Sequence, residues 1–267
     1  MQRKFEYSIV MPGTRAYLDY LALRHKVFCE ELKRVPSQGQ CFSDIPLESD
    51  AHDVYSLHVL CRSRDAGNAV GCARLILPSS KGLSISSRYR MSHQTNISPR
   101  QIGEVGRLAI AKELRRNRGE LSSSGLHQAY AQRPSSSSAM DKQDGPIVAL
   151  GLYREIFNLA HKHGITHCYA AMERSLARLL TRIGFPFQVV GPLNTLVHPP
   201  RQPYFIGAHA IRTALFNRDA CLSQFMFEPS TGNSEHPVSL SHTNTELHPF
   251  AIPRVGERSG QYPAFSQ

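Results

Sequence analysis

The chain has 267 residues, of which 41% are hydrophobic, and its formal net charge at pH 7 is +10. This length suits one large domain, and the apolar content is sufficient for a packed core. A basic chain attracts acidic partners such as nucleic acid, anionic lipid or an acidic carrier protein. No stretch approaches the roughly 18 apolar residues of a membrane-spanning helix, and the first eight residues lack the apolar run of a signal peptide. We therefore expect a cytoplasmic protein with no transmembrane segment.

The first half of the chain predicts one helix and three strands. Thr14 is a suitable N-cap for a helix from Arg15 to about Lys33. Residues 54–62 and 69–77 alternate between apolar and polar side chains around a turn at 65–68, which predicts a β-hairpin. Residues 103–111 predict a third strand. The segments 35–45 and 79–100 are polar, and we expect a loop and an irregular stretch there.

The second half alternates between helical and strand patterns. Residues 148–163 predict an amphipathic helix that ends at Gly164, and residues 176–183 predict a second helix closed by Gly184. Strands are expected at 165–172, 185–191 and 202–208. A serine-rich insertion at about 121–146 interrupts a domain of residues 1–227, and residues 228–267 predict a polar, disordered tail. The order of elements indicates an α/β fold, with a mixed central sheet flanked by helices.

An acidic cluster, Glu48, Asp50 and Asp53, precedes the predicted hairpin in an otherwise basic chain. Its simplest interpretation is a solvated loop, because loop carboxylates commonly cap turns. The alternative is a site in which these carboxylates meet the strand residues Arg74 and Arg107. Such arginines either belong to an internal ion-pair network or bind a substrate carboxylate, and the two roles are compatible. We expect the five side chains to converge on one cleft.

Four short motifs in order carry a resemblance to a known group of enzymes. They are R-x-x-V-F-C-x-E from Arg24, E-x-D-x-x-D from Glu48, G-C-A-R-L from Gly71 and E-V-G-R-L-A-I from Glu104. Together they resemble the acyl-homoserine-lactone synthases and the N-acyl amino acid synthases, and most closely the acyltransferases associated with the exosortase/PEP-CTERM sorting system. The resemblance covers about residues 15–208. The lactone synthases carry a tryptophan shortly after the first motif, and this chain has none, which favours the exosortase-associated or N-acyl amino acid branch.

The resemblance implies a GNAT fold and an N-acyltransferase. The expected reaction moves a fatty acyl group from acyl-carrier protein, or from coenzyme A, to the amine of an amino acid or a similar small metabolite. The thioester is a co-substrate, and no permanently bound cofactor is expected. The implied catalytic residues are Glu48, Glu104 and Arg107, with either glutamate able to supply the base. The implied substrate-binding residues are Arg24, Phe28, Asp50, Asp53 and Arg74.

The donor is expected along the end of the third predicted strand and the basic run that follows it. The expected donor-binding residues are Leu108, Ala109, Ile110, Lys112, Arg115, Arg116, Arg118 and Gly119. The basic run is either a solvated helix start or a dock for an acidic carrier protein or a pantetheine phosphate. Residues 116–121 keep only the first half of the phosphate-binding loop Q/R-x-x-G-x-G/A, which agrees with a weaker dependence on coenzyme A.

Other functions and sites remain as alternatives. The chain could be an acetyl-CoA-dependent N-acetyltransferase, or a non-catalytic module that binds acyl carriers. Nucleic-acid binding is disfavoured, because no RRM, helix-turn-helix or zinc-finger pattern accompanies the charge. Cys29 is interpreted as a small apolar helix residue rather than a nucleophile. His161, His163 and His167 suit the end of a helix better than a zinc site, and no metal is expected.

The last expectation concerns the strand that carries Glu104 and Arg107. Side chains alternate along a regular strand, so residues three apart lie on opposite faces. The two side chains share one pocket only if an extra residue shifts the alternation. We therefore expect a β-bulge at about 106–109, with Gly106 tolerating unusual backbone dihedrals. The alternative is a regular strand with the two side chains on opposite faces.

Overall fold

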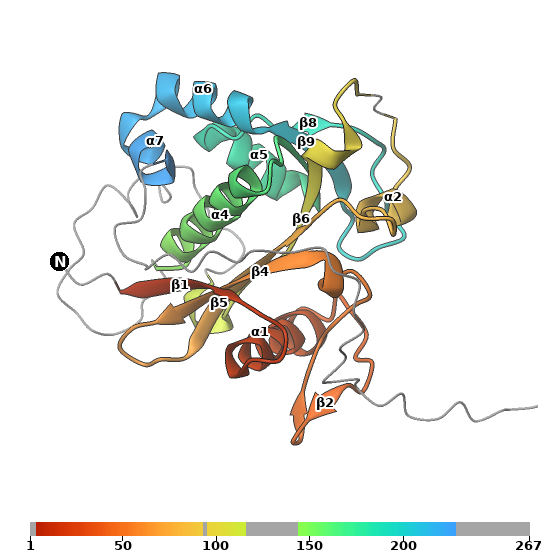
Figure 1. The fold of residues 1–267 in the computed structure, drawn as a ribbon, viewed down its shortest axis with the longest axis vertical. Helices are drawn as coiled ribbons and strands as arrows, with labels where there is room; N and C mark the ends of the chain where they lie inside the picture. The colour runs from red at the N-terminus through yellow and green to blue at the C-terminus, as the bar shows by residue number, and fades with distance from the viewer. Residues whose placement is uncertain (1–3, 93–94, 116–143, 228–267) are drawn as a thin grey trace, which may run out of the picture. The chain divides into compact units, whose positions relative to one another are not determined.

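A computed structural model describes residues 4–92, 95–115 and 144–227. Its central feature is a mixed sheet that contains seven strands within these ranges, in the order β1-β4-β5-β6-β7-β9-β8 (Figure 1). Adjacent strands are antiparallel except for β6 and β7, which are parallel. The strands are β1 (Phe5–Val10), β4 (Ser56–Ser63), β5 (Ala69–Ile76), β6 (Ile102–Ile110), β7 (His167–Met172), β8 (Gln188–Val189) and β9 (Gln202–Gly207).

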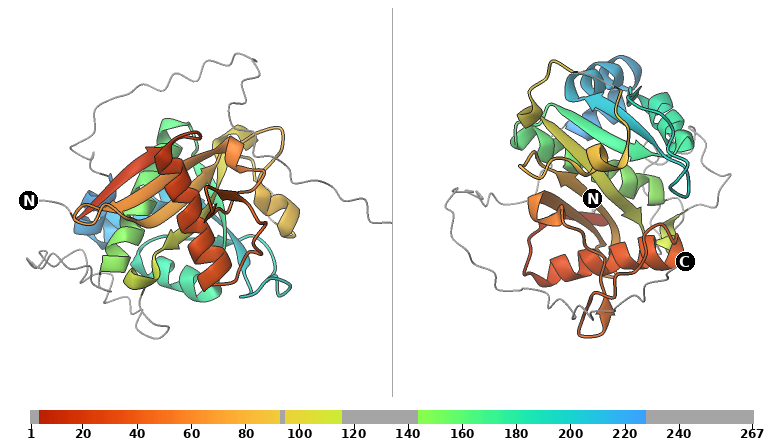
Figure 2. Two further views of the ribbon diagram at one scale, coloured as in Figure 1. Left: turned by 90° about the horizontal axis from the view of Figure 1, so that it is seen from below. Right: turned by 90° about the vertical axis from the view of Figure 1, so that its right-hand side faces the viewer.

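Helices cover both faces of this sheet, as Figures 1 and 2 show. The α-helices are α1 (Arg15–His25), α2 (Ser84–Arg88), α4 (Asp144–Lys162), α5 (Arg174–Ile183), α6 (Ala208–Arg218) and α7 (Ala220–Phe227). A Cβ atom added to Gly71 of β5 would meet Val148 and Leu152, so this side of the strand faces α4. Arg74, three residues further along the same strand, lies on the opposite face with α1. These two faces are called the α4 face and the α1 face below.

Shorter elements complete the described part of the chain. A π-helix, η1 (Lys26–Glu31), continues α1, and a two-stranded ribbon follows it, made of β2 (Cys41–Phe42) and β3 (Ile45–Pro46). Three 3₁₀ turns are η2 (Asp53–Tyr55), η3 (Pro99–Gln101) and η4 (Lys112–Leu114).

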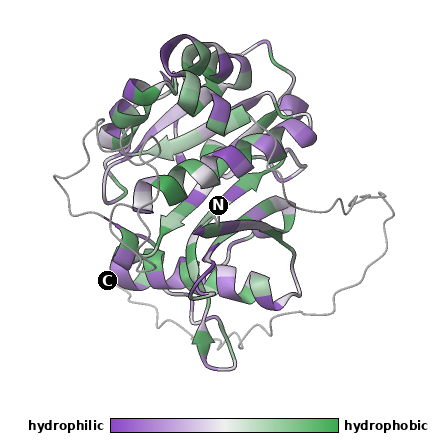
Figure 3. Ribbon diagram, turned by 90° about the vertical axis from the view of Figure 1, so that its left-hand side faces the viewer, coloured by the Kyte–Doolittle hydropathy of each residue, from purple (hydrophilic) through white to green (hydrophobic). Residues whose placement is uncertain are grey.

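The apolar core divides into two main clusters on either side of α4. The first packs α1 and α4 against β1, β4 and β5, and includes Tyr20, Leu60 and Leu152. The second packs α4, α5, α6 and α7 against β7 and β9, and includes Phe157 and Leu215. Figure 3 shows hydrophobic residues on the strands, and hydrophobic and hydrophilic residues alternating along the helices. Because α4 contributes to both clusters, it holds the two halves of the sheet together.

Most of the predicted elements are confirmed. The hairpin is β4 and β5, the third strand is β6, and the segments 148–163, 165–172, 176–183 and 202–208 correspond to α4, β7, α5 and β9. Thr14 caps α1, since its Oγ1 accepts a hydrogen bond from the Tyr17 N–H at 3.2 Å. The strand β1 and the helices α6 and α7 were not predicted from the sequence.

Five predicted segments differ from the structure. The first helix becomes a π-helix after His25 and ends at Glu31. The loop 35–45 contains β2, the irregular stretch 79–100 contains α2, and the strand predicted at 185–191 is reduced to β8. The serine-rich insertion was expected to reach 146, but α4 already begins at Asp144. The rest of the insertion and the tail 228–267 lie outside the described residues.

Candidate active site

Six charged side chains meet on the α1 face of the sheet. Arg24 of α1 donates to Glu48 (Nε to Oε2, 2.5 Å) and to Asp53 (Nη1 to Oδ1, 2.7 Å). Arg74 of β5 donates through Nη1 to Asp53 Oδ1 at 2.6 Å and to Asp50 Oδ1 at 2.8 Å. Arg107 of β6 donates through Nη2 to Glu48 Oε1 at 2.9 Å and to Asp50 Oδ2 at 2.8 Å. The predicted convergence of Glu48, Asp50, Asp53, Arg74 and Arg107 is therefore confirmed, but they meet in a largely buried network, and of the five only Arg107 lines the cavity described below. The six residues are called the ionic network below.

The ionic network has no net charge, because three guanidiniums are matched to three carboxylates, and its side chains are almost fully shielded from solvent. Arg24 and Arg74 are fully buried, and Glu48 and Asp53 are nearly so. Burial alone would raise the pKa of Glu48 and of Asp53, but the adjacent guanidiniums outweigh it and lower both. The pKa of Asp50 is also lowered, because Arg74 and Arg107 overcome the effect of burial. These carboxylates stay ionised near neutral pH and are poor proton acceptors.

A β-bulge in β6 turns Arg107 toward the ionic network. The register between β5 and β6 pairs Arg74 with Gly106 and then Cys72 with Ala109, so two residues of β6 lie opposite one residue of β5. The extra residue keeps Glu104, Gly106 and Arg107 on the α1 face. The predicted bulge is confirmed, but its unusual dihedral belongs to Arg107, with φ 51°, and not to Gly106. A non-glycine residue in the left-handed region is uncommon and costs about 1–3 kcal/mol, which its buried ion pairs offset.

Glu104 lies on the α1 face but outside the ionic network. Its Oε2 accepts a hydrogen bond from the backbone N–H of Ile85 in α2 at 2.8 Å. Burial raises the pKa of Glu104 above its usual range, although the Ile85 N–H and the nearby Arg74 act in the opposite direction. The structure therefore holds one carboxylate with a raised pKa beside three whose pKa is lowered. Such a division separates a proton acceptor from groups that remain charged.

The π-helix η1 places Phe28 over the ionic network. Its wider turn is closed by a hydrogen bond from the Leu32 N–H to the Val27 carbonyl, and π-helical turns occur frequently at functional sites. The Phe28 ring lies 5.8 Å from the guanidinium carbon of Arg107, within the range of a cation–π contact. Cys29, next to Phe28, is half-buried, and burial raises its pKa, so its thiol is largely protonated and a weak nucleophile.

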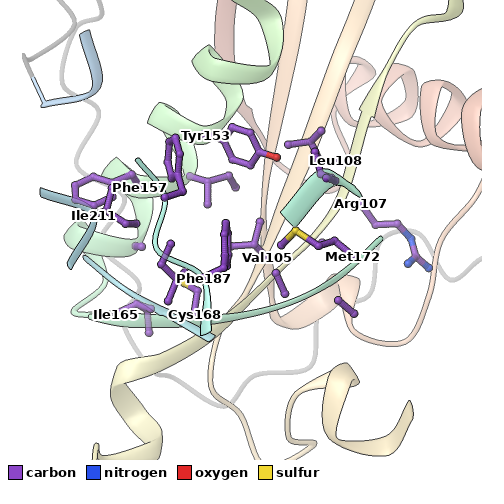
Figure 4. A pocket seen from close by; sticks show the side chains of 18 of the residues that line it. Val105, Arg107, Leu108, Tyr153, Phe157, Ile165, Cys168, Met172, Phe187 and Ile211 are labelled. Atoms are coloured by element: carbon purple, nitrogen blue, oxygen red, sulfur yellow. The ribbon is translucent and has the colours of Figure 1, made fainter. Parts of the chain in front are cut away.

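A cavity of about 190 Å³ opens beside Arg107, where β6 and β7 part. These strands pair from Ile102–His167 to Val105–Ala170, and the structure records no pairing between them beyond the bulge. The cavity wall is mostly apolar and comes from β6, β7, α4, α5 and α6. Figure 4 shows Tyr153, Phe157, Phe187 and Ile211 around its apolar chamber, with the Arg107 head group directed away from that chamber. The gap between the strands therefore leads from the ionic network into an apolar chamber.

The expected donor-binding residues lie in different places. Leu108 lines the cavity, whereas Ala109 and Ile110 pair with Cys72 and Gly71 outside it. Lys112 is exposed, and Arg115 forms an ion pair with Glu31 of η1. Arg116, Arg118 and Gly119 lie outside the described residues.

Comparisons with known proteins show what this chain resembles. Residues 23–123 match the model of the acetyltransferase (GNAT) domain. The chain is 23% identical over 177 residues to an acyl-homoserine-lactone synthase from Vibrio anguillarum, covering 66% of this chain and 76% of that protein.

Two solved structures share the fold. The acyl-homoserine-lactone synthase LasI has a TM-score of 0.53 at 15% identity, over 80% of this chain and 94% of that chain. TofI, in a ternary complex with an inhibitor and MTA, has a TM-score of 0.53 at 16% identity, over 78% and 96% respectively. The fold is GNAT-like, and the chain is an enzyme that transfers acyl groups.

Much of the cavity wall lies outside the sequence motifs. Tyr153 and Phe157 fit the apolar face of α4 as well as any core residue does, and the sequence gives no sign that they border a cavity. Arg34, Glu173 and Arg201 also line the cavity, and none belongs to a motif. Of the helices in the described ranges, none is long and apolar enough to cross a membrane.

Proposed function

We propose that this acyltransferase moves a fatty acyl group from a thioester to the amine of an amino acid or similar small metabolite. The observation that carries the proposal is the apolar cavity that opens between β6 and β7, directly beside Arg107 and the bulge. An acyl chain enters this gap from the α1 face. Its thioester carbonyl then stays next to Glu104 and the ionic network, where the acceptor amine approaches.

The cavity favours an acyl chain longer than acetyl. At roughly 30 Å³ for a water-sized group, a volume of about 190 Å³ holds on the order of six such groups. Each buried methylene contributes about 0.8 kcal/mol to binding, so a fatty acyl chain gains affinity from the chamber and an acetyl group gains little. This difference favours a fatty acyltransferase over the alternative of an acetyl-CoA-dependent acetyltransferase.

Glu104 is the better of the two candidate bases. Its raised pKa makes it a stronger proton acceptor than Glu48, whose charge is held by Arg24 and Arg107. In this mechanism Glu104 takes a proton from the acceptor amine, directly or through one water molecule. Glu48 and Asp50 instead hold the Arg107 guanidinium in place. Arg24, Arg74 and Asp53 are too buried to touch the acceptor and instead hold the ionic network together, whereas Phe28 lines the cavity beside it.

The reaction is a direct attack on the thioester. The amine nitrogen forms a bond to the carbonyl carbon, and the tetrahedral intermediate then loses the thiolate as the C–S bond breaks. The proton from the amine passes to Glu104 and on to the leaving thiolate, which restores the carboxylate. Backbone N–H groups released from strand pairing at the bulge are the natural donors to the oxyanion. No acyl-enzyme forms in this route, and Cys29 takes no part in it.

Finer features of the proposal rest on the sequence motifs. The R-x-x-V-F-C-x-E opening supports an association with the exosortase/PEP-CTERM system. A cytoplasmic location is part of the same proposal. Acyl-carrier protein is the proposed donor, because its acidic surface suits a chain of net charge +10. Exposed Lys112 is the described part of the basic run that remains available to dock it.

The proposal is tested with the purified full-length chain. Octanoyl-acyl-carrier protein and octanoyl-coenzyme A are each incubated with a mixture of the twenty standard amino acids. Thiol release is followed together with mass spectrometry of the products. We expect N-octanoyl products, formed faster from the carrier protein. Acetyl-coenzyme A used in preference to both octanoyl donors would favour the acetyltransferase, and binding of octanoyl-acyl-carrier protein without any transfer would favour a non-catalytic module.

A further inference from the structure

A second group of charged side chains lines the cavity next to the ionic network. Arg34 follows η1, Glu173 lies between β7 and α5, and Arg201 precedes β9. The pairing of Met172 with Gln202 across β7 and β9 brings Glu173 and Arg201 to the same end of the two strands. The Arg34 backbone is tied to η1, because its N–H donates to the Phe28 carbonyl at 2.8 Å. All three side chains are therefore positioned by regular elements that border the site.

The charges of this group do not balance. The Arg107 guanidinium, which also lines the cavity, is matched by Glu48 and Asp50. Arg34 is matched by Glu173, with Nη2 and Oε1 2.5 Å apart. For the half-buried Arg201 the structure shows no hydrogen bond or ion pair of the guanidinium with any described residue. Glu173 is also the one carboxylate among the described cavity-lining residues. One positive charge at the cavity is therefore left without a matching carboxylate.

The surroundings of Arg201 are costly for a cation. Burial lowers the pKa of its guanidinium, and the positive charges of Arg34 and Arg107 lower it further, while Tyr89 and Glu173 oppose the shift without cancelling it. Arginine nevertheless remains charged in proteins and offers a planar pair of donors that fits a carboxylate with two parallel hydrogen bonds. An anion bound at Arg201 would relieve the repulsion and restore the charge balance of the cavity.

We propose that Arg201, together with Arg34, binds the carboxylate of the acceptor, so that the enzyme selects amino acids with a free carboxylate. This inference rests on the proposed function and adds to it which group of the acceptor is recognised. An α-amino acid carries its amine and its carboxylate on the same carbon. With the amine held between Glu104 and the thioester, the carboxylate falls on the neighbouring guanidiniums, and the side chain of the acceptor points away from the apolar chamber.

A phosphate of the donor is the other anion that an arginine pair could bind, and the test separates the two. The full-length enzyme is assayed with octanoyl-acyl-carrier protein and the twenty L-amino acids, and then with the amides of those that react. KM and kcat are measured for acceptor and donor in the wild type, Arg201→Gln, Arg201→Lys and Arg34→Gln. Arg178→Gln, which removes an exposed arginine from α5 outside the cavity, is the matched control.

We expect the wild type to prefer the free acid over its amide by at least tenfold in kcat/KM. Arg201→Gln raises KM for the acid at least tenfold, with little change in kcat, in donor KM or in the reaction of the amide. Arg201→Lys recovers part of the loss, and Arg178→Gln behaves as the wild type. Arg34→Gln also raises KM for the acid but not for the amide, by a smaller factor, and it serves as the test if Arg201→Gln fails to fold.

Three results would overturn the inference while the proposed function stands. They are equal use of acids and amides by the wild type, an equal loss for acids and amides in both variants, and an increase in donor KM instead of acceptor KM. The last result would assign the arginines to the donor phosphate. Absence of transfer to every acceptor would overturn the proposed function itself, and the inference with it.

Discussion

Asp53→Asn removes one negative charge from the centre of the ionic network without changing the side-chain shape. Asp53 Oδ1 accepts hydrogen bonds from Arg24 at 2.7 Å and Arg74 at 2.6 Å, and its Oδ2 accepts the Asp50 N–H at 2.8 Å. The change leaves two fully buried guanidiniums with too little negative charge. Breaking a buried pair in this way costs about 3–5 kcal/mol of the free energy of unfolding. For a domain of this size that lowers Tm by about 6–20 °C.

The assay is unfolding in urea and by heat, followed by circular dichroism at pH 7. The matched control is Asp19→Asn, which also removes a carboxylate that lies between two arginines, Arg15 and Arg62. These two ion pairs are partly exposed, so their loss costs only about 0–1 kcal/mol of the free energy of unfolding. The gap between Asp53→Asn and the wild type should narrow as pH falls. The pKa of Asp53 is lowered in the folded state, so its stabilisation exists above its unfolded pKa of about 4 and disappears as pH falls through the folded value.

Equal destabilisation by Asp53→Asn and Asp19→Asn would refute this reasoning, because buried ion pairs would then contribute no more to the free energy of unfolding than exposed ones. A gap that stayed constant down to pH 2 would also contradict it, since the charge of Asp53 would not be its source.

Three further changes separate activity from stability. Glu104→Gln should lower kcat/KM at least 100-fold. It should not lower Tm at pH 7, because a carboxylate whose pKa is raised by burial gives no stabilisation once ionised. A normal rate would exclude Glu104 as the base. Gly106→Val should keep or raise Tm but slow octanoyl transfer. An added Cβ meets no atom within 4 Å and enters the space left for the thioester, so unimpaired transfer would place the donor elsewhere. Cys29→Ala should keep most activity, and an octanoyl-cysteine seen by intact-protein mass spectrometry of the wild type would contradict direct attack.

The sequence was sufficient for much of the fold because periodicity reports which face of an element is buried. The alternation in 54–62 and 69–77 predicted β4 and β5, and the motif spacing predicted the bulge through the alternation of Glu104 and Arg107. Short elements could not be predicted in this way, because they are too short to show a period. Helix α2 has five residues, too few to show a repeating helical pattern in the sequence. Its Ile85 N–H nevertheless donates a hydrogen bond to Glu104. At the bulge, the sequence favoured Gly106 for the unusual dihedral, but the structure assigns it to Arg107, whose ion pairs the sequence alone could not weigh.

Part of the candidate site could be predicted from the sequence, and part could not. The ionic network could be predicted because opposite charges are rarely buried unpaired. The cavity could not, since Tyr153 and Phe157 resemble core residues until the parting of β6 and β7 is known. Arg201 and Arg34 are far apart in the chain and belong to no motif. Arg201 comes close to Glu173 because β7 pairs with β9, and Arg34 reaches Glu173 from the end of η1 through an ion pair.

We propose that this acyltransferase makes N-acyl products from thioester donors. The activity is tested by mass spectrometry of lipid extracts from cells that overproduce either the wild type or Glu104→Gln at matched protein levels. We expect a new N-acyl species in the wild-type extract, whose mass and fragments identify both acyl chain and acceptor, and its near absence in the Glu104→Gln extract. Identical extracts from the two cultures, with both proteins folded, would contradict the account.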